Sequence, residues 1–146
     1  EGNPKAFPFT KPKVDGLNFS FSGLKTQILY FIQKNVAINP NFIEENKADI
    51  CASIQYTIIN ILMDKLKLAV AETGINQIAI GGGVSANSGI RTTLKEAEKK
   101  YGWKSYIPKF EYTTDNAAMI GIVGYYNFLE ENFSQADVTS KARIEF

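Results

Sequence analysis

The stretch that decides the fold is residues 77–102, QIAIGGGVSANSGIRTTLKEAEKKYG. It begins with a short β-branched run at 77–80, turns through three consecutive glycines and continues as an amphipathic helical pattern that stops near Gly102. We therefore expect a strand, a glycine turn and a helix in succession.

A second strand follows this helix. Residues 104–107 form a short predicted strand that Pro108 stops. A strand, a crossover helix and another strand imply a parallel pair. Upstream, apolar residues at every fourth position over 50–69 predict a long core helix that ends at Gly74.

The N-terminal part combines an arm and a helix. Residues 1–18 are rich in proline, glycine and lysine, which favours an extended arm. The alternation at 18–22 predicts a short strand, and Ser22 is placed to cap a helix that Asn39 and Pro40 close.

One more helix is predicted in the C-terminal part. Residues 113–116 are typical of a helix start, and a largely apolar helix continues to about Glu130. Residues 137–146 are polar, and we expect them to pack loosely. The fold class is therefore α/β and helix-rich, with a small parallel sheet covered by helices in one domain.

Composition excludes several classes of protein. Apolar residues make up 45% of the chain and charged residues 21%, the balance of a soluble globular domain. The net charge of +1 does not by itself favour a polyanionic partner. Because histidine is absent, any histidine-dependent chemistry must be completed by residues outside this sequence.

Cellular context follows from what the sequence lacks. Cys51 is the single cysteine, so no disulfide framework is predicted and a reducing compartment fits. No signal segment opens the sequence, and its longest apolar run is too short to cross a bilayer. We expect a cytoplasmic protein without membrane contact.

The glycine turn is the sharpest local signal for a ligand. Without Cβ atoms at Gly81, Gly82 and Gly83, a phosphate or sugar can approach the backbone, and the helix that follows offers N–H donors. The alternative is a turn with no ligand. The turn also matches the G-x-G-x-x-A dinucleotide fingerprint, but the next strand ends in Ile107-Pro108-Lys109 without an acidic residue for the ribose, which disfavours NAD.

Two side chains near helix starts each have two interpretations. Asn87 can cap the helix after the turn or offer its amide to a ligand. Asp115 can cap the apolar helix or bind a metal ion. Residue types alone favour the cap in both cases. Lys25, in the first turn of the first helix, can face an anionic partner or only solvent.

Three motifs together carry a resemblance to a known family. FSFSGLKT at 19–26, GGGVSAN at 81–87 and TTDNAAMIG at 113–121 resemble, in order and spacing, the C-terminal region of the TsaD (formerly Gcp) family, with wording similar to Bacteroidetes members. The resemblance implies the C-terminal part of the second lobe of an actin-like (ASKHA) fold over 1–146, without the N-terminal lobe.

The resemblance also implies an activity. Members of that family transfer a threonylcarbamoyl group from threonylcarbamoyl-AMP to N6 of the adenosine adjacent to the anticodon in tRNAs that read A-starting codons. By resemblance, Gly81, Gly82, Gly83 and Asn87 contact the substrate, and no side chain of this chain acts as a nucleophile. Asp115 would be one ligand of a divalent metal ion, iron or zinc, whose other ligands are two histidines of the missing lobe.

Further expectations concern partners and the isolated chain. The family's partners are a paralogous non-catalytic subunit and a small ATPase, which dock mainly through the missing lobe. A lone carboxylate binds a transition metal weakly, so we expect the isolated chain to be inactive. The alternative is a nucleotide-binding or assembly module without chemistry. An uncovered sheet edge would also allow a homodimer.

Overall fold

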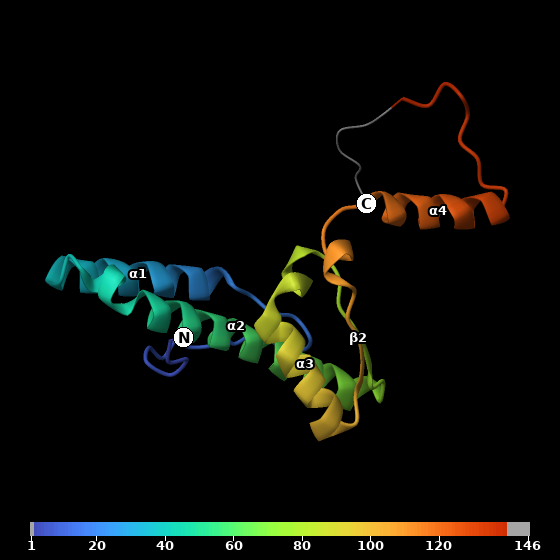
Figure 1. Cartoon of the computed structure of the whole chain (residues 1–146). Helices are drawn as coiled ribbons and strands as arrows, with labels where there is room; N and C mark the ends of the chain where they lie inside the picture. Colours follow the sequence, from blue (N-terminus) through green and yellow to red (C-terminus); the bar gives the residue numbers. More distant parts are fainter. Residues whose placement is uncertain (1, 140–146) are drawn as a thin grey trace.

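The computed structural model describes residues 2–139, which form a helix-rich chain with a small sheet (Figure 1). The elements in chain order are α1 (Ser22–Ile38), α2 (Phe42–Thr73), β1 (Gln77–Ala79), the 3-10 helix η1 (Gly83–Ala86), α3 (Ser88–Tyr101), β2 (Lys104–Tyr106), the 3-10 helix η2 (Phe110–Tyr112) and α4 (Ala117–Leu129). This architecture confirms the predicted fold class.

The two strands pair in parallel, as the order of elements predicts. Gln77 lies opposite Lys104 and Ala79 lies opposite Tyr106. The Ile80 N–H continues the pairing by donating to the Tyr106 carbonyl over 3.1 Å. Because α3 makes the crossover between the strands, the turn before α3 lies at the carboxyl end of β1, where parallel sheets commonly place ligands.

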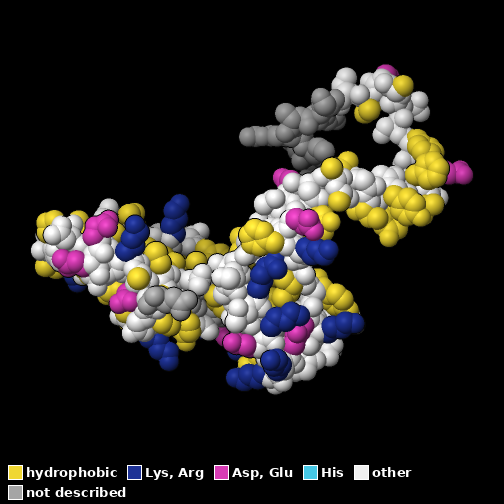
Figure 2. Space-filling view, viewed as in Figure 1, with side chains coloured by type: hydrophobic (Ala, Val, Ile, Leu, Met, Phe, Trp, Pro, Cys, Tyr) yellow, Lys and Arg dark blue, Asp and Glu magenta, His cyan; other side chains and the backbone are white. Residues whose placement is uncertain are grey.

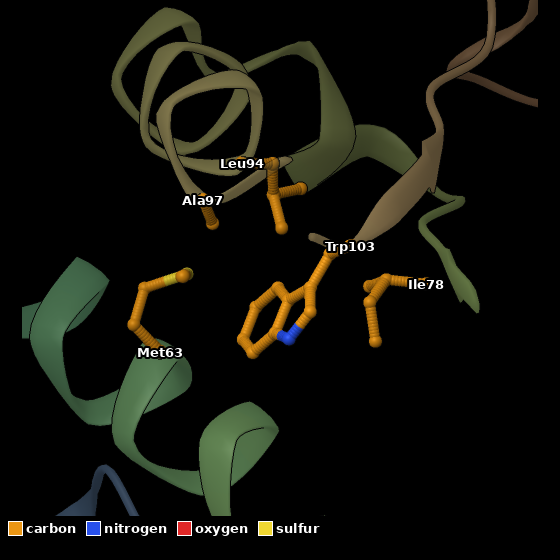
Figure 3. Packing of buried hydrophobic residues seen from close by; sticks show 5 residues of the cluster. All are labelled: Met63, Ile78, Leu94, Ala97 and Trp103. Atoms are coloured by element: carbon orange, nitrogen blue, oxygen red, sulfur yellow. The ribbon is translucent and has the colours of Figure 1, made fainter. Parts of the chain in front are cut away.

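The main hydrophobic core lies where α2, α3 and the sheet meet (Figure 3). Leu94 and Ala97 come from α3 and Met63 from α2, while Trp103 fills the space between Met63 and Ile78. Leu94 is only 1% exposed. Burial of these side chains therefore holds the crossover helix against both α2 and β1.

Two left-handed glycines end the helices as predicted. Gly74 follows α2 with φ 71° and donates to the Val70 carbonyl over 2.9 Å. Gly102 follows α3 with φ 69° and donates to the Glu98 carbonyl over 3.1 Å. Glycine adopts this conformation without the steric cost that other residues meet, so both helices stop sharply before a strand.

The N-terminal segment is bound to the hairpin of α1 and α2. The Asn3 N–H donates to the Asp49 carboxylate over 2.7 Å. The Lys65 ammonium of α2 donates to the Val14 carbonyl over 2.7 Å. Rings of the segment and of both helices also pack together, namely Phe7, Phe9, Phe31 and Phe42. This segment therefore forms a second, aromatic contact region distant from the main core.

The predicted strand at 18–22 is wrong. No strand is present there, and Ser22 is the first residue of α1 rather than its cap. Phe21 occupies the cap position, with no side-chain cap hydrogen bond. Within residues 2–139 no neighbouring strand accepts this segment, and an alternating pattern without a partner cannot form a sheet.

The last helix, α4, stands apart from the core (Figures 1 and 2). None of its residues is buried, and Ile120 is 77% exposed. Its limits agree with the predicted apolar helix. No helix within residues 2–139 has the length and apolar composition needed to cross a bilayer. The prediction for 137–146 falls mostly outside the described residues.

Truncating the central core residue tests this packing. We expect Leu94→Ala to lower the free energy of unfolding by about 2–5 kcal/mol, because it removes buried methyl groups and leaves a cavity. Urea denaturation followed by Trp103 fluorescence measures the loss. Leu29→Ala is the control, because Leu29 is 52% exposed, and a loss as large as that of Leu94→Ala would contradict the assignment of the core.

A carboxylate, that of Glu98, links α3 to β2 and makes the free energy of unfolding depend on pH. The Glu98 carboxylate accepts hydrogen bonds from the Ser105 hydroxyl, from the Ser105 N–H over 2.8 Å and from the Lys95 ammonium over 3.1 Å. These bonds lower the pKa of Glu98 from 4.5 to about 2. The stabilisation is therefore complete above pH 4.5 and is lost as the pH falls toward 2.

We expect Glu98→Gln to remove this part of the acid sensitivity. Urea unfolding measured between pH 6 and pH 2.5 should show a shallower loss of stability for the variant than for the unsubstituted chain. Glu96→Gln, an exposed change on the same helix, should keep the original profile. Identical profiles for all three proteins would refute the role given to Glu98.

Candidate functional site

The glycine turn exposes backbone donors at the end of β1. Gly81, Gly82 and Gly83 are all exposed, and a Cβ atom added to any of them would meet open space. Within residues 2–139 the N–H groups of Gly81 and Gly82 make no hydrogen bond. The turn therefore offers free donors to a ligand, and such donors suit a phosphate.

Among the three glycines of the turn, only Gly82 has a positive φ and so needs to be glycine for conformational reasons. Its φ of 77° and ψ of 172° lie in a region that other residues rarely enter. The turn then continues as η1, which was not predicted from the sequence. In η1 the Ser85 N–H donates to the Gly82 carbonyl over 2.9 Å, while the buried Ser85 hydroxyl has no hydrogen-bond partner within the described chain.

Asn87 divides its amide between two contacts. Its Oδ1 accepts from the Ile90 N–H over 3.0 Å and so caps α3, as predicted. Its Nδ2 donates to Oε1 of Gln55 in α2 over 3.1 Å. Because an amide nitrogen carries two hydrogens, Asn87 can still donate one hydrogen bond to a ligand. The cap therefore does not exclude a ligand contact.

Two of the three sequence motifs meet at one cavity. A cavity of about 630 Å³ lies between α1, α2 and the start of α3, and Lys25 and Asn87 are among its polar residues. Its other lining residues are Phe21, Leu24, Ile28, Gln55, Ile58, Ile59, Leu62, Val84 and Ile90. A smaller cavity of about 220 Å³ adjoins Gly81 and Ser85 and shares part of this lining. The first motif therefore lies close to the turn in space.

Asp115 is placed differently from these residues. It is exposed, lines neither cavity and makes no hydrogen bond or ion pair with any of residues 2–139. It does not cap α4, because Asn116 occupies the cap position and accepts from the Met119 N–H over 3.3 Å. The expectation from residue type that Asp115 is a cap is therefore wrong, and no group among residues 2–139 occupies its carboxylate.

The donor set for a metal ion is incomplete in the described part of the chain. Over residues 2–139, no three His, Cys, Asp or Glu side chains come close enough to hold an ion. Asp115 fits as one oxygen ligand, but a transition metal site commonly needs three or four protein ligands. Further ligands would have to come from outside these residues.

Arg91 connects the turn to the segment that leads to Asp115. Its Nε donates to the Ser85 carbonyl over 2.6 Å, and its Nη2 donates to the Pro108 carbonyl over 2.8 Å. The guanidinium also lies 5.9 Å from the ring centroid of Phe110 in η2. Arg91 was not predicted from the sequence as a functional residue. Its position near the start of α3 is nevertheless a signal, because a cation in the first turns of a helix opposes the helix dipole and so indicates another role.

This arrangement defines a class of protein. It is an α/β protein in which a glycine turn, a capped helix start and an apolar cavity lie side by side, with the exposed carboxylate of Asp115 further along the chain. Such a site can bind an anionic group through backbone N–H donors and an adjacent apolar or planar group in the cavity. Among the described residues that line its two cavities, there is no pair of side chains suited to acid–base catalysis.

Comparison with known proteins identifies the family. Residues 1–122 match the family model described as "TsaD: tRNA N6-adenosine threonylcarbamoyltransferase". A protein of that name from Christiangramia forsetii is 66% identical over 146 residues, and one from Cytophaga hutchinsonii is 51% identical over 144 residues. A protein of the same name from Clostridium beijerinckii is 40% identical over 147 residues.

The chain belongs to this family, which confirms the resemblance found in its three motifs. The matches cover 99–100% of the chain but only 42–43% of each of these relatives. The chain therefore spans about two fifths of the length of the relatives it matches.

Two neighbouring glycines allow the turn to be tested. We expect Gly82→Ala to cost about 1–3 kcal/mol of stability, because alanine is strained at a φ of 77°. Gly81→Ala is the matched control, because its φ is not positive and the added methyl group meets no atom. Thermal unfolding of both variants measures the difference, and equal losses would contradict the conformation of the turn.

Proposed function

We propose that this chain forms part of an enzyme that transfers a threonylcarbamoyl group from threonylcarbamoyl-AMP to N6 of the adenosine adjacent to the anticodon in tRNAs that read A-starting codons. Membership of the family supports the reaction. The observation that carries the proposal is the contact of two family motifs with one cavity, through Lys25 and Asn87.

The turn and Asn87 would hold the adenylate. The free N–H groups of Gly81 and Gly82 suit phosphate oxygens, and the cavity beside them suits an apolar or planar group. The remaining Nδ2 hydrogen of Asn87 can only be donated, so this side chain would contact an acceptor atom of the substrate. These groups position the acyl donor rather than react with it.

Asp115 would contribute one ligand to a divalent metal ion, iron or zinc, that histidines from elsewhere in the enzyme complete. When bound, such an ion would stabilise negative charge that develops on the acyl and phosphate oxygens. The part this chain plays is to present a carboxylate that has no competing ion-pair partner among residues 2–139. Because a lone carboxylate holds such an ion weakly, we propose that the chain by itself does not turn over.

A specific observation supports a second candidate, a nucleotide-binding module without chemistry. The groups assigned to the adenylate are assembled within residues 2–139, whereas the metal ligands are not. Titration of the isolated chain with AMP separates the candidates. Measurable binding would show that the turn is complete by itself, and binding by the full-length protein alone would show a site shared with another lobe.

Substitutions in the full-length enzyme test the assigned roles. We expect Asn87→Asp to lower the transfer rate by about 10²-fold, because it keeps the acceptor that caps α3 and removes the donor. Asp115→Asn should lower the rate at least as much and should also weaken metal binding. Mass spectrometry of the modified nucleoside measures transfer. Unchanged rates in both variants would refute both assignments.

A further inference from the structure

Positive charge is concentrated in one segment of a nearly neutral chain. Residues 91–109 contain six Lys and Arg residues and two Asp and Glu residues, a net charge of +4, whereas the rest of the chain sums to −3. Figure 2 shows the Lys and Arg side chains gathered over the region that Figure 1 labels α3. The net charge of +1 is therefore the sum of a basic segment and a slightly acidic remainder, so the charge is unevenly distributed along the chain.

The basic segment borders a groove of about 620 Å³ between α3 and the loop after β2. Arg91, Lys95 and Lys99 follow each other at four-residue spacing along one face of α3, so their side chains form a row about 6 Å apart along the axis. Lys109 lies across from this row in the loop. The other lining residues are Thr92, Glu96, Ile107 and Pro108.

Most of this charge is not neutralised within the described chain. Lys95 shares Glu98 with Ser105, and the N–O distance of that ion pair is 3.1 Å. Lys99 and Lys109 form no ion pair with any of residues 2–139. Arg91 donates to two backbone carbonyls, which satisfy its hydrogens without cancelling its charge. The groove therefore holds four cations against one carboxylate, that of Glu96.

We propose that this groove binds the sugar–phosphate backbone of the tRNA substrate, an inference that rests on the proposed function. A row of exposed lysines provides flexible point charges, which suit phosphates and carry no sequence information. The groove also adjoins the glycine turn, because Arg91 lines the groove and donates to Ser85 of η1. A polynucleotide held there would bring its neighbouring nucleotides close to the adenylate.

A charge-removing variant in the full-length protein tests the inference. Lys95→Gln, Lys99→Gln and Lys109→Gln together should weaken binding of labelled tRNA about 10-fold to 100-fold at 0.1 M salt. The slope of log affinity against log salt concentration should become shallower by about 2–3, because three phosphate contacts are lost. Fluorescence anisotropy across salt concentrations measures both quantities.

The control variant removes the same charge elsewhere. Lys5→Gln, Lys34→Gln and Lys47→Gln change exposed lysines of the N-terminal segment, α1 and α2. This control variant should keep the original tRNA affinity and salt slope. A third variant, Lys95→Arg with Lys99→Arg and Lys109→Arg, keeps the charge of the groove and should bind tRNA as the unsubstituted protein does. If the triple variant fails to fold by circular dichroism, Lys99→Gln with Lys109→Gln removes only unpaired charges and should lower the slope by about 1–2.

The outcomes separate this inference from the proposed function. Unchanged tRNA affinity and slope in the groove variant would overturn the inference even if transfer is intact. An equal loss of tRNA binding in the control variant would also overturn it, because the effect would then not belong to this groove. If the groove variant lost binding to polyglutamate, an acidic polymer that is not RNA, as strongly as binding to tRNA, the effect would not be specific to RNA and the inference would be overturned too. Loss of tRNA binding in the groove variant alone would support it, even in an enzyme that fails to transfer threonylcarbamoyl.

Discussion

Packing of α3 against the C-terminal half of α2 is the constraint on which the site depends. Leu94 of α3 is almost fully buried, and Met63 of α2 and Trp103 lie in the same cluster. This contact fixes the position of the crossover helix, while the backbone hydrogen bonds between β1 and β2 set the spacing of the two strands. The glycine turn connects β1 to α3. Its position therefore follows from the packing of these two elements in the core rather than from the residues of the turn itself.

A second constraint is polar and acts further from the core. Arg91 joins the Ser85 and Pro108 carbonyls, which belong to two loops separated in sequence by α3 and β2. Hydrogen bonds from a guanidinium fix direction as well as distance, because its donors lie in a rigid plane. The loop that leads to Asp115 is thereby tied to η1, which follows the glycine turn.

The sequence predicted those elements whose signals are local. The glycines at 74 and 102 end their helices by their own conformational freedom, and periodicity was enough to predict the strand pair and its crossover. The failures depend on distant residues. Alternation at 18–22 could not show that no strand lies beside it, and Asp115 and Asn116 are both good caps, so only the backbone path decides which one serves. The position of Arg91 near a helix start signals some further role, but the sequence does not show which carbonyls it binds.

The exposure of α4 has a consequence for Asp115. A 13-residue helix that buries none of its residues against the rest of residues 2–139 is only marginally stable in water, so its amide protons would exchange with solvent far faster than those of α3. Asp115 directly precedes this helix and is held by no contact of its own within residues 2–139. A surface that covered α4 would therefore also order this carboxylate, which is the side chain that we propose as a metal ligand.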